Sequence, residues 1–457
     1  MSLTVSKIHF TRRTDRAVYL TPALAKELRL RGGGTVDVKL GGKTVTAQVK
    51  AQKGKGRHLY LPAAIREAIR APKTGNIYLS TADGGTTVRI GPLIGVLTSG
   101  GGTAARPFGS RTGLIRELVR AGSGKAYVFA FTPKDVDWDQ NTVLGYFADP
   151  DGGWSRRTVP LPDVVYNRLA SRSADVSLGM EQLKQRFLRR NIPIFNWSFY
   201  NKWDVYRMLE DEPEAYKHVP ESTLNPTPEQ MREMLRRHKF IYLKPTGGSL
   251  GKGIYRITYA PGKGYFARFR SNGKNTLLRF QNFSSLMTML GASSGRLRRY
   301  VAQQGIRLID IEGNPIDFRF HLVRNQSNQW VVAGIGAKMA GRGSVTTHIK
   351  NGGTLMTPEQ ALGRVFGDKA SDVLDRMKNV SIKLAEAIQN NSRHHVGELG
   401  FDLGVDTNEH IWMFEANSKP GRSIFKHPAL KEEGRETLSL VFQHCLYLAK
   451  FRKRGNA

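Results

Sequence analysis

The pattern of apolar and polar positions in the first hundred residues occurs twice, with the second copy 41 residues after the first. Each copy reads as a strand, a short amphipathic helix and two further strands. The apolar positions that define the copies are Tyr19, Leu20, Leu24 and Leu28, and then Tyr60, Leu61, Ile65 and Ile69. A unit of this size cannot bury one face alone, so the pattern predicts that both copies interlock in one small β-barrel-like domain over residues 1–92. Chance similarity between short elements is the alternative. We find no catalytic group here and expect a docking or substrate-presenting role.

From residue 93 the pattern changes to that of an α/β layer. Leu93–Leu97 is a continuous apolar run typical of a buried strand, Thr112–Ala121 has helical spacing, and Ala126–Phe131 is the next apolar strand. Similar elements continue to Asn196 and predict a Rossmann-like domain over residues 93–199. The glycine-rich loop Thr98–Thr103 lacks the spacing of a dinucleotide-binding fingerprint, so we favour a plain connection over an anion site.

A lysine and a glycine-rich segment follow an apolar strand in the third region, residues 200–457. Phe240–Leu243 runs directly into Lys244, and another strand, Ile254–Thr258, follows the glycines, which predicts a hairpin lid. Glycines allow backbone amides to approach a phosphate closely. The residues predicted to bind phosphate here are Lys244, Gly247, Gly248, Ser249, Gly251 and Gly253. The segment is not a Walker A loop, because Thr246 and Gly253 stand where that motif needs Gly and Ser or Thr. A flexible turn without a ligand is the alternative.

The stretch from Gly397 to Phe425 predicts a metal site on a strand hairpin. Glu415 and Asn417 point the same way because strand side chains alternate, and a turn near Thr407–Glu409 would return Asp402 beside them. Mg²⁺ prefers such oxygen ligands and completes its shell with phosphates and water. The pattern therefore suggests a Mg²⁺ site next to a bound nucleotide. A polar strand edge is the alternative.

The amino-acid composition limits which classes of partner the protein can bind. The 457 residues include 70 Lys and Arg against 38 Asp and Glu, which gives a net charge of +32. Such a surface attracts polyanions, whether an acidic peptide, a protein, a polymer or nucleic acid, and we favour nucleic acid least because no basic-aromatic module is present. No apolar run approaches the roughly 18 residues of a membrane span, and the N-terminus lacks an apolar signal core, so we expect a cytoplasmic protein. Cys445, the single cysteine, lies in an apolar helical run typical of a core position.

Six motifs between Leu161 and Gly421 resemble the YheC/YheD family, the endospore coat-associated ATP-grasp proteins. They are LPDVVYNR, NKWDVYRML, YLKPTGGSLGKGIYRI, YVAQQGI, DFRFHLVRN and GELGFDLGVD…FEANSKPG. The resemblance implies a multidomain protein of the α/β and α+β classes. Residues 93–199 would be a pre-ATP-grasp domain, and residues 200–457 an ATP-grasp domain with its lid at about 225–305.

The resemblance also implies roles for individual residues around ATP. Lys202 and Lys244 would hold the α- and β-phosphates, and the amides of Gly247–Gly253 would cover the β- and γ-phosphates. Backbone groups of the hinge would read the adenine edge, Met413 would pack on its face, and Asp310 or Glu312 would reach the ribose. The hinge residues are Gln303, Gln304, Gly305 and Ile306.

The remaining implied roles concern the reacting end of the nucleotide. Asp402, Glu415 and Asn417 match the family's metal ligands, and Arg319 would face the γ-phosphoryl group, with Asp317 orienting it; an ordinary ion pair is the alternative for these last two. The expected contacts of the second substrate are Lys338, Arg342, His348, Asn351, Gly352, Gly353, Lys419 and Arg422.

Two classes of function follow from the resemblance. One is a carboxylate-amine ligase that acts through an acylphosphate on a peptide or protein during spore coat formation. The other is a catalytically silent nucleotide-binding coat component. Both imply synthesis in the mother-cell cytoplasm, with association with the spore coat. A nucleic-acid-associated protein is a third, less favoured option.

Overall fold

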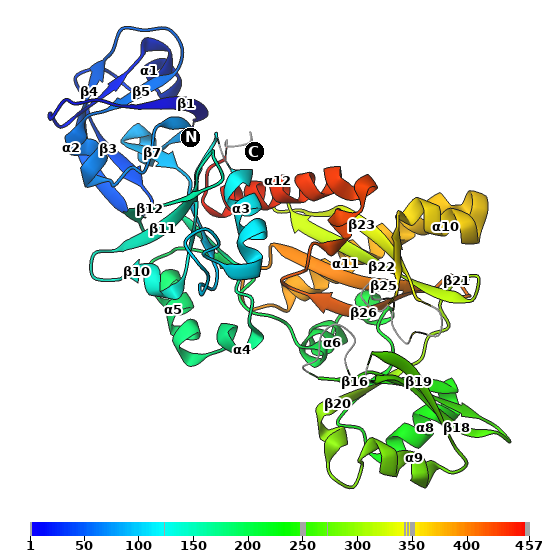
Figure 1. Cartoon of the computed structure of the whole chain (residues 1–457). Coiled ribbons are helices and arrows are strands. Elements are labelled where there is room, and N and C mark those ends of the chain that lie inside the picture. The colour runs from blue at the N-terminus through cyan, green and yellow to red at the C-terminus, as the bar shows by residue number, and fades with distance from the viewer. Residues whose placement is uncertain are drawn as a thin grey trace.

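The structure, a computed structural model, describes residues 2–122, 124–246, 253–271, 273–341, 344, 347 and 352–452. Its strands form a closed barrel and three open sheets, which follow one another along the chain from the blue to the red end of Figure 1. This arrangement confirms the predicted multidomain α/β and α+β class. In the described part of the chain, no helix is both long and apolar enough to cross a membrane.

The first ninety residues form the barrel that the repeat predicts. Its strands are β1 (Leu3–Phe10), β2 (Ala17–Leu20), β3 (Thr35–Leu40), β4 (Lys43–Ala51), β5 (His58–Leu61), β6 (Gly75–Ala82) and β7 (Thr87–Gly91), with helices α1 (Pro22–Leu28) and α2 (Ala63–Ala68). The repeated units are β2-α1-β3-β4 and β5-α2-β6-β7. They interlock because β2 pairs with β5 and β3 pairs with β7, and β1 closes the barrel by pairing with both β5 and β6.

The second sheet is Rossmann-like. Parallel pairings join β13, β8 and β9, and β14 continues the parallel set at one end, while β11 returns antiparallel to β9 at the other. The elements are β8 (Leu93–Leu97), α3 (Thr112–Ala121), β9 (Tyr127–Phe131), β10 (Val136–Asp137), β11 (Thr142–Ala148), β12 (Trp154–Pro160), β13 (Val164–Asn167), α4 (Arg172–Asp175), α5 (Leu178–Leu188) and β14 (Ile194–Phe195). The glycine-rich loop after β8 leads toward α3.

The third sheet is the predicted lid, which we call the lid sheet, and its pairings are all antiparallel in the order β15-β20-β16-β17-β18-β19. Its elements are β15 (Ser222–Leu224), α8 (Pro228–His238), β16 (Phe240–Pro245), β17 (Tyr255–Ala260), β18 (Gly264–Ser271), β19 (Lys274–Phe280), α9 (Phe283–Leu290) and β20 (Tyr300–Gln304). One apolar cluster joins α8 and α9 to Ile241, Leu243, Ile257 and Ala267, so both helices cover the same face of the sheet. The opposite face of the sheet is turned toward the main body of the molecule (Figure 1).

The fourth sheet, in the order β24-β23-β22-β25-β26, carries the predicted metal hairpin. Its elements are α6 (Lys202–Glu210), α7 (Pro213–Tyr216), β21 (Asp310–Ile311), β22 (Asn314–Arg324), β23 (Trp330–Met339), β24 (Thr354–Met356), α10 (Pro358–Phe366), α11 (Ala370–Asn390), β25 (Glu398–Val405), β26 (Ile411–Asn417) and α12 (Lys431–Leu448). One apolar cluster packs α6, α10 and α11 on one face. Helix α12 instead packs between this sheet and the Rossmann-like sheet, where Cys445 is fully buried as its sequence context predicts.

Candidate functional site

The hairpin of β25 and β26 brings the predicted metal ligands together. Asp402 is paired directly with Glu415, and Gly400 with Asn417, so all three predicted ligands share one end of the hairpin. The turn lies at 406–410, as the sequence predicts, and Asp406 fixes it by accepting hydrogen bonds from the backbone N–H groups of Asn408 and His410, both at 2.9 Å.

A β-bulge changes the face to which Met413 belongs. Asp402 pairs with Glu415 but the next residue, Leu403, pairs with Met413, so Phe414 is an extra residue in β26. Met413 therefore points into the core with Leu403 and has no exposed surface. This burial argues against the expected packing of Met413 on adenine, since simple alternation from Glu415 does not hold across the bulge. Phe414 is the half-buried side chain next to Glu415.

Asp402 is surrounded by cations from the neighbouring strands β22 and β23. Both of its carboxylate oxygens contact Arg319, at 2.9 Å each, and Lys338 donates a further bond of 2.9 Å. Lys338 also contacts Asp317 at 2.8 Å, and Thr347 donates to the same carboxylate. Burial lowers the pKa of Lys338, but the charges of Asp317 and Asp402 outweigh burial and raise it. The cluster is thus a network of ion pairs held on one sheet surface.

The donor set fits a cation that is completed by phosphate and water. The Asn417 side chain makes no hydrogen bond within the described part of the chain, and the one ion pair of Glu415 there is with Lys202, at 3.6 Å. These two side chains therefore keep oxygen lone pairs available. No group of three or more His, Cys, Asp or Glu side chains able to hold a metal occurs among the described residues. The residues thus suit Mg²⁺ bound together with a nucleotide better than an all-protein cage.

Two lysines from separate elements converge on this hairpin. Lys202 is the first residue of α6, which begins there because the Asn201 side chain accepts a hydrogen bond of 2.8 Å from the Asp204 N–H. Lys244 ends the apolar run of β16 and lies over the Phe414 ring, with its Nζ 5.6 Å from the ring centre. Burial and the charge of Lys202 lower the pKa of Lys244 to about 8. Since no carboxylate among the described residues forms an ion pair with this desolvated ammonium, Lys244 is a ready site for an anion.

The hinge residues have distinct structural roles. The Gln303 side chain is buried, where it accepts a hydrogen bond from Lys244 and donates to Tyr206 and Ser222, so it positions the lysine. Gln304 pairs with the backbone of Glu221 through both its N–H and its side chain. Gly305 is required because an added Cβ would lie 2.2 Å from the Phe240 ring. In the part of the chain that the structure describes, the Ile306 N–H has no hydrogen-bond partner, which leaves it available to a purine edge.

Several predicted residues lie outside the described residues or are engaged elsewhere. Gly247, Gly248, Ser249, Gly251, Arg342, His348 and Asn351 lie outside the described residues. Gly253 has a φ of 73° and an added Cβ would meet Pro245 at 3.0 Å, so glycine is needed at the end of the loop. Arg422 donates to the carbonyl of Gly434, and Asp310 accepts from the Gly313 N–H in an exposed turn. Gly352 and Gly353 immediately precede β24.

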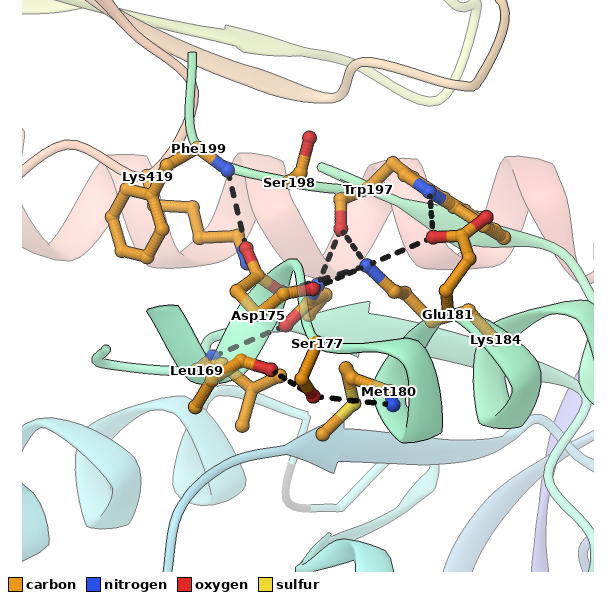
Figure 2. A network of polar contacts seen from close by, with 12 residues as sticks. Leu169, Asp175, Ser177, Met180, Glu181, Lys184, Trp197, Ser198, Phe199 and Lys419 are labelled. Carbon is orange, nitrogen blue, oxygen red and sulfur yellow. Dashed lines mark hydrogen bonds and ion pairs between the residues drawn. The ribbon is translucent and has the colours of Figure 1, made fainter. Parts of the chain in front are cut away.

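Lys419 belongs to a buried network that sequence reasoning missed (Figure 2). Its ammonium contacts Asp175 at 2.6 Å, and the same carboxylate accepts hydrogen bonds from the Phe199 N–H at 3.1 Å and the Asn167 side chain at 3.0 Å. Lys184 donates to the Asp175 carbonyl at 2.9 Å. Burial lowers the pKa of Lys419 to about 7, against the opposing charge of Asp175. The network ties the loop after Asn417 to the Rossmann-like domain, and it leaves Lys419 little surface for a substrate.

A second buried cluster joins the same two parts of the molecule. Glu398 of β25 accepts hydrogen bonds from Tyr166 and from Arg168, the latter at 3.0 Å, and lies 2.7 Å from His321. Burial raises the pKa of Glu398, but Arg168, His321 and Tyr166 outweigh burial and lower it to about 2. These residues occur in the motifs LPDVVYNR, DFRFHLVRN and GELGFDLGVD, so the motifs themselves were the available signal for their roles.

Comparison with known proteins identifies the family of this chain. The YheC/D-like ATP-grasp family model matches residues 191–448. Endospore coat-associated protein YheD of Bacillus subtilis (strain 168) is 35% identical over 373 residues, covering 80% of this chain and 80% of that protein. YheC of the same organism is 23% identical over 334 residues, covering 70% of this chain and 87% of that protein. A solved structure, D-alanyl-alanine synthetase A from Vibrio cholerae, has a TM-score of 0.46 at 11% identity, and the match covers 78% of this chain and 98% of that chain. Since the family model spans more than half of the chain and YheD aligns over four fifths of it, this chain belongs to the YheC/D-like ATP-grasp family.

Proposed function

We propose that the chain binds ATP with Mg²⁺ between the lid sheet and the β25–β26 hairpin, and uses it as a carboxylate-amine ligase. The observation that carries the proposal is the convergence of Lys202 and Lys244 on the hairpin that bears Asp402, Glu415 and Asn417. Paired lysines next to the oxygen ligands of Glu415 and Asn417 suit a metal-bound polyphosphate.

The binding roles follow from where the side chains lie. Lys202 and Lys244 would contact the phosphates, and the lid loop would cover them. The Ile306 N–H would meet the adenine edge, and Phe414, in place of Met413, would pack on the adenine face. Asp402, Glu415 and Asn417 would hold one or two Mg²⁺ ions, which neutralise charge on the phosphates as the γ-phosphoryl group is transferred.

The chemistry would proceed in two steps. A substrate carboxylate oxygen attacks the γ-phosphorus and ADP leaves, which gives an acylphosphate. An amine then attacks the acyl carbon, loses a proton and expels phosphate. Arg319 lies on the same surface as the metal ligands and would stabilise the negative charge that develops on the transferred group. The protein acts by positioning and charge stabilisation, so this scheme requires no nucleophilic side chain.

The names of the curated relatives support a role in the spore coat. We propose that the acceptor is a peptide or protein present during coat formation, with the protein made in the mother-cell cytoplasm. The net charge of +32 favours an acidic substrate.

Nucleotide binding is tested by thermal unfolding with and without Mg-ATP. We expect Mg-ATP to raise the melting temperature of the parent protein and to have little effect on Lys244→Met or Glu415→Gln. Glu409→Gln is the matched control, because Glu409 is a carboxylate of the same hairpin that lies in its turn and pairs with Arg376. Absence of stabilisation in the parent would refute the ATP site.

Turnover is tested separately by release of ADP and phosphate when fractions of spore-coat extract are added. The ligase proposal predicts release with the parent and with Glu409→Gln, and none above background with Glu415→Gln. Stabilisation by Mg-ATP with no release in any fraction would instead support the silent coat component.

A further inference from the structure

The lid has an unusual distribution of charge. Between Glu233 and Asp310 the sequence contains 15 Lys and Arg residues and no Asp or Glu. This segment of 76 residues therefore accounts for nearly half of the net charge of +32. The one lysine of the proposed ATP site that lies in this segment, Lys244, does not explain a surplus of this size. A segment with many basic and no acidic residues attracts a polyanion, in addition to the phosphates of ATP.

Four arginines of this segment, Arg256, Arg268, Arg270 and Arg279, lie on the face of the lid sheet that the helices leave uncovered. Ile257 and Ala267 point toward α8 and α9 and have no exposed surface, so the alternate residues Arg256 and Arg268 point the other way. The strand pairings align Tyr242, Arg256, Arg268 and Leu277 in one row across the sheet, and Thr258, Phe266 and Arg279 in the next. The first row begins beside Gln303, at the ATP cleft, and ends at the outer strand β19.

Among the residues that the structure describes, these arginines have no anionic partner. Arg256 and Arg268 are directly opposite each other on β17 and β18, an arrangement of like charges that costs stability. The Nε of Arg256 is buried and has no hydrogen-bond partner within the described residues. Among the described residues 234–309, ion pairs involve only Arg237 and His238, which lie on α8. In the described part of the chain, therefore, no acidic side chain neutralises the charge of the basic face.

Strand β19 adds an open backbone edge to this face. It is the last strand of the sheet, and its only strand partner among the described residues is β18. Leu277 and Leu278, on its two faces, are 54% and 38% exposed, which is high for leucines in the middle of a strand. An unpaired strand edge with exposed leucines is a template for an added strand.

We propose that an extended peptide rich in Asp and Glu binds the lid as an added strand along β19. Its backbone pairs with the free edge, its carboxylates meet Arg268, Arg270 and Arg279, and an apolar side chain covers Leu277. The open edge favours a peptide over nucleic acid, which has no backbone donors to pair with it. Binding of the peptide does not depend on the proposed ligase function. Only the further statement that this peptide is the substrate, or the recognition segment of the substrate, rests on that function.

The test measures binding of a fluorescent peptide of alternating Glu and Thr to the full-length protein, without ATP. We expect saturable binding that weakens as salt is added, and a Kd about tenfold higher for Arg268→Gln/Arg270→Gln. The matched control is Arg232→Gln/Arg236→Gln, which removes the same charge from α8 on the other side of the sheet, and its Kd should change less than about twofold.

A second peptide, methylated on alternate backbone nitrogens, keeps the charge but cannot pair along one edge, and we expect it to bind at least about tenfold more weakly. Equal binding of both peptides, or equal loss in both double variants, would overturn strand addition. So would tighter binding of a single-stranded oligonucleotide with the same dependence on Arg268, or a dimer in sedimentation that disappears in Leu277→Lys. Because ATP is absent, these outcomes leave the ligase proposal to its own test.

Discussion

The Nζ of Lys244 lies 5.6 Å from the centre of the Phe414 ring, so a cation of the lid meets an aromatic side chain of the metal hairpin. This contact joins two sheets whose strands are about 170 residues apart in sequence. It gives the proposed ATP cleft one wall made by β16 and one made by β26.

The titration of Lys244 predicts the pH dependence of ATP binding. The pKa of Lys244 is lowered to about 8 by burial and by Lys202, and phosphate binds the protonated form. Affinity should be flat below pH 8 and should fall by up to about tenfold per pH unit above it, because the proton must then be taken up on binding. Calorimetric titration with Mg-ATP between pH 7 and 9 measures this slope. In Lys244→Met the slope should vanish, and a slope that persists would assign the titration to another group.

The bulge in β26 predicts opposite effects for two adjacent residues. Phe414→Ala should lower Mg-ATP affinity by about tenfold with little change in stability, because its ring faces the cleft. Met413→Ala should lower the free energy of unfolding by about 2–5 kcal/mol and leave the affinity of the folded protein unchanged, because its side chain is fully buried. Denaturant unfolding and calorimetry on both variants separate the two effects. The reverse pattern would restore Met413 to the site.

The cluster around Glu398 predicts acid sensitivity. The pKa of Glu398 is lowered to about 2 in the folded protein, from an ordinary value near 4.5. Its contribution to stability is therefore complete above about pH 4.5 and is lost as pH falls toward 2. Glu398→Gln should destabilise the protein at neutral pH by about 3–5 kcal/mol, since it leaves Arg168 buried without its charge partner. Its unfolding free energy should also depend less on pH between 4.5 and 2 than that of the parent.

The Asp175 network predicts a non-additive double variant. Asp175→Asn alone leaves the buried Lys419 without its carboxylate and should cost several kcal/mol, on the order of 3–5. Adding Lys419→Met removes the buried charge that has lost its partner, and it should recover part of the lost free energy of unfolding. Unfolding free energies of the two single variants and the double variant form the cycle. Simple additivity would show that the two side chains are not coupled.

The local sequence pattern was sufficient to predict those elements in which residues close together in the sequence determine which face is buried. The 41-residue repeat predicted the barrel because both copies bury the same positions, and the run Leu93–Leu97 and the helix Thr112–Ala121 have the predicted bounds. The hairpin of Asp402 and Glu415 also has the predicted register, since its short turn fixes the pairing.

Other features of the site depend on contacts between residues far apart in the sequence, or on irregularities in a strand, and the spacing of apolar residues does not predict these. The bulge at Phe414 moved Met413 into the core, because one inserted residue reverses the alternation. Asp175 and Lys419 are 244 residues apart, and each alone reads as an ordinary exposed charge. The roles of the site residues toward ATP and Mg²⁺ stay predictions until ligand binding is measured.

The two buried clusters also bear on how the protein can be divided. The family match begins at residue 191, but Asp175, Lys184, Tyr166 and Arg168 all lie before it. A fragment cut at that boundary would keep Lys419 and Glu398 and lose the partners that neutralise them. The segment by which the family is recognised is therefore smaller than the unit that these contacts hold together, and protein for crystallography or assay should keep the Rossmann-like domain with it.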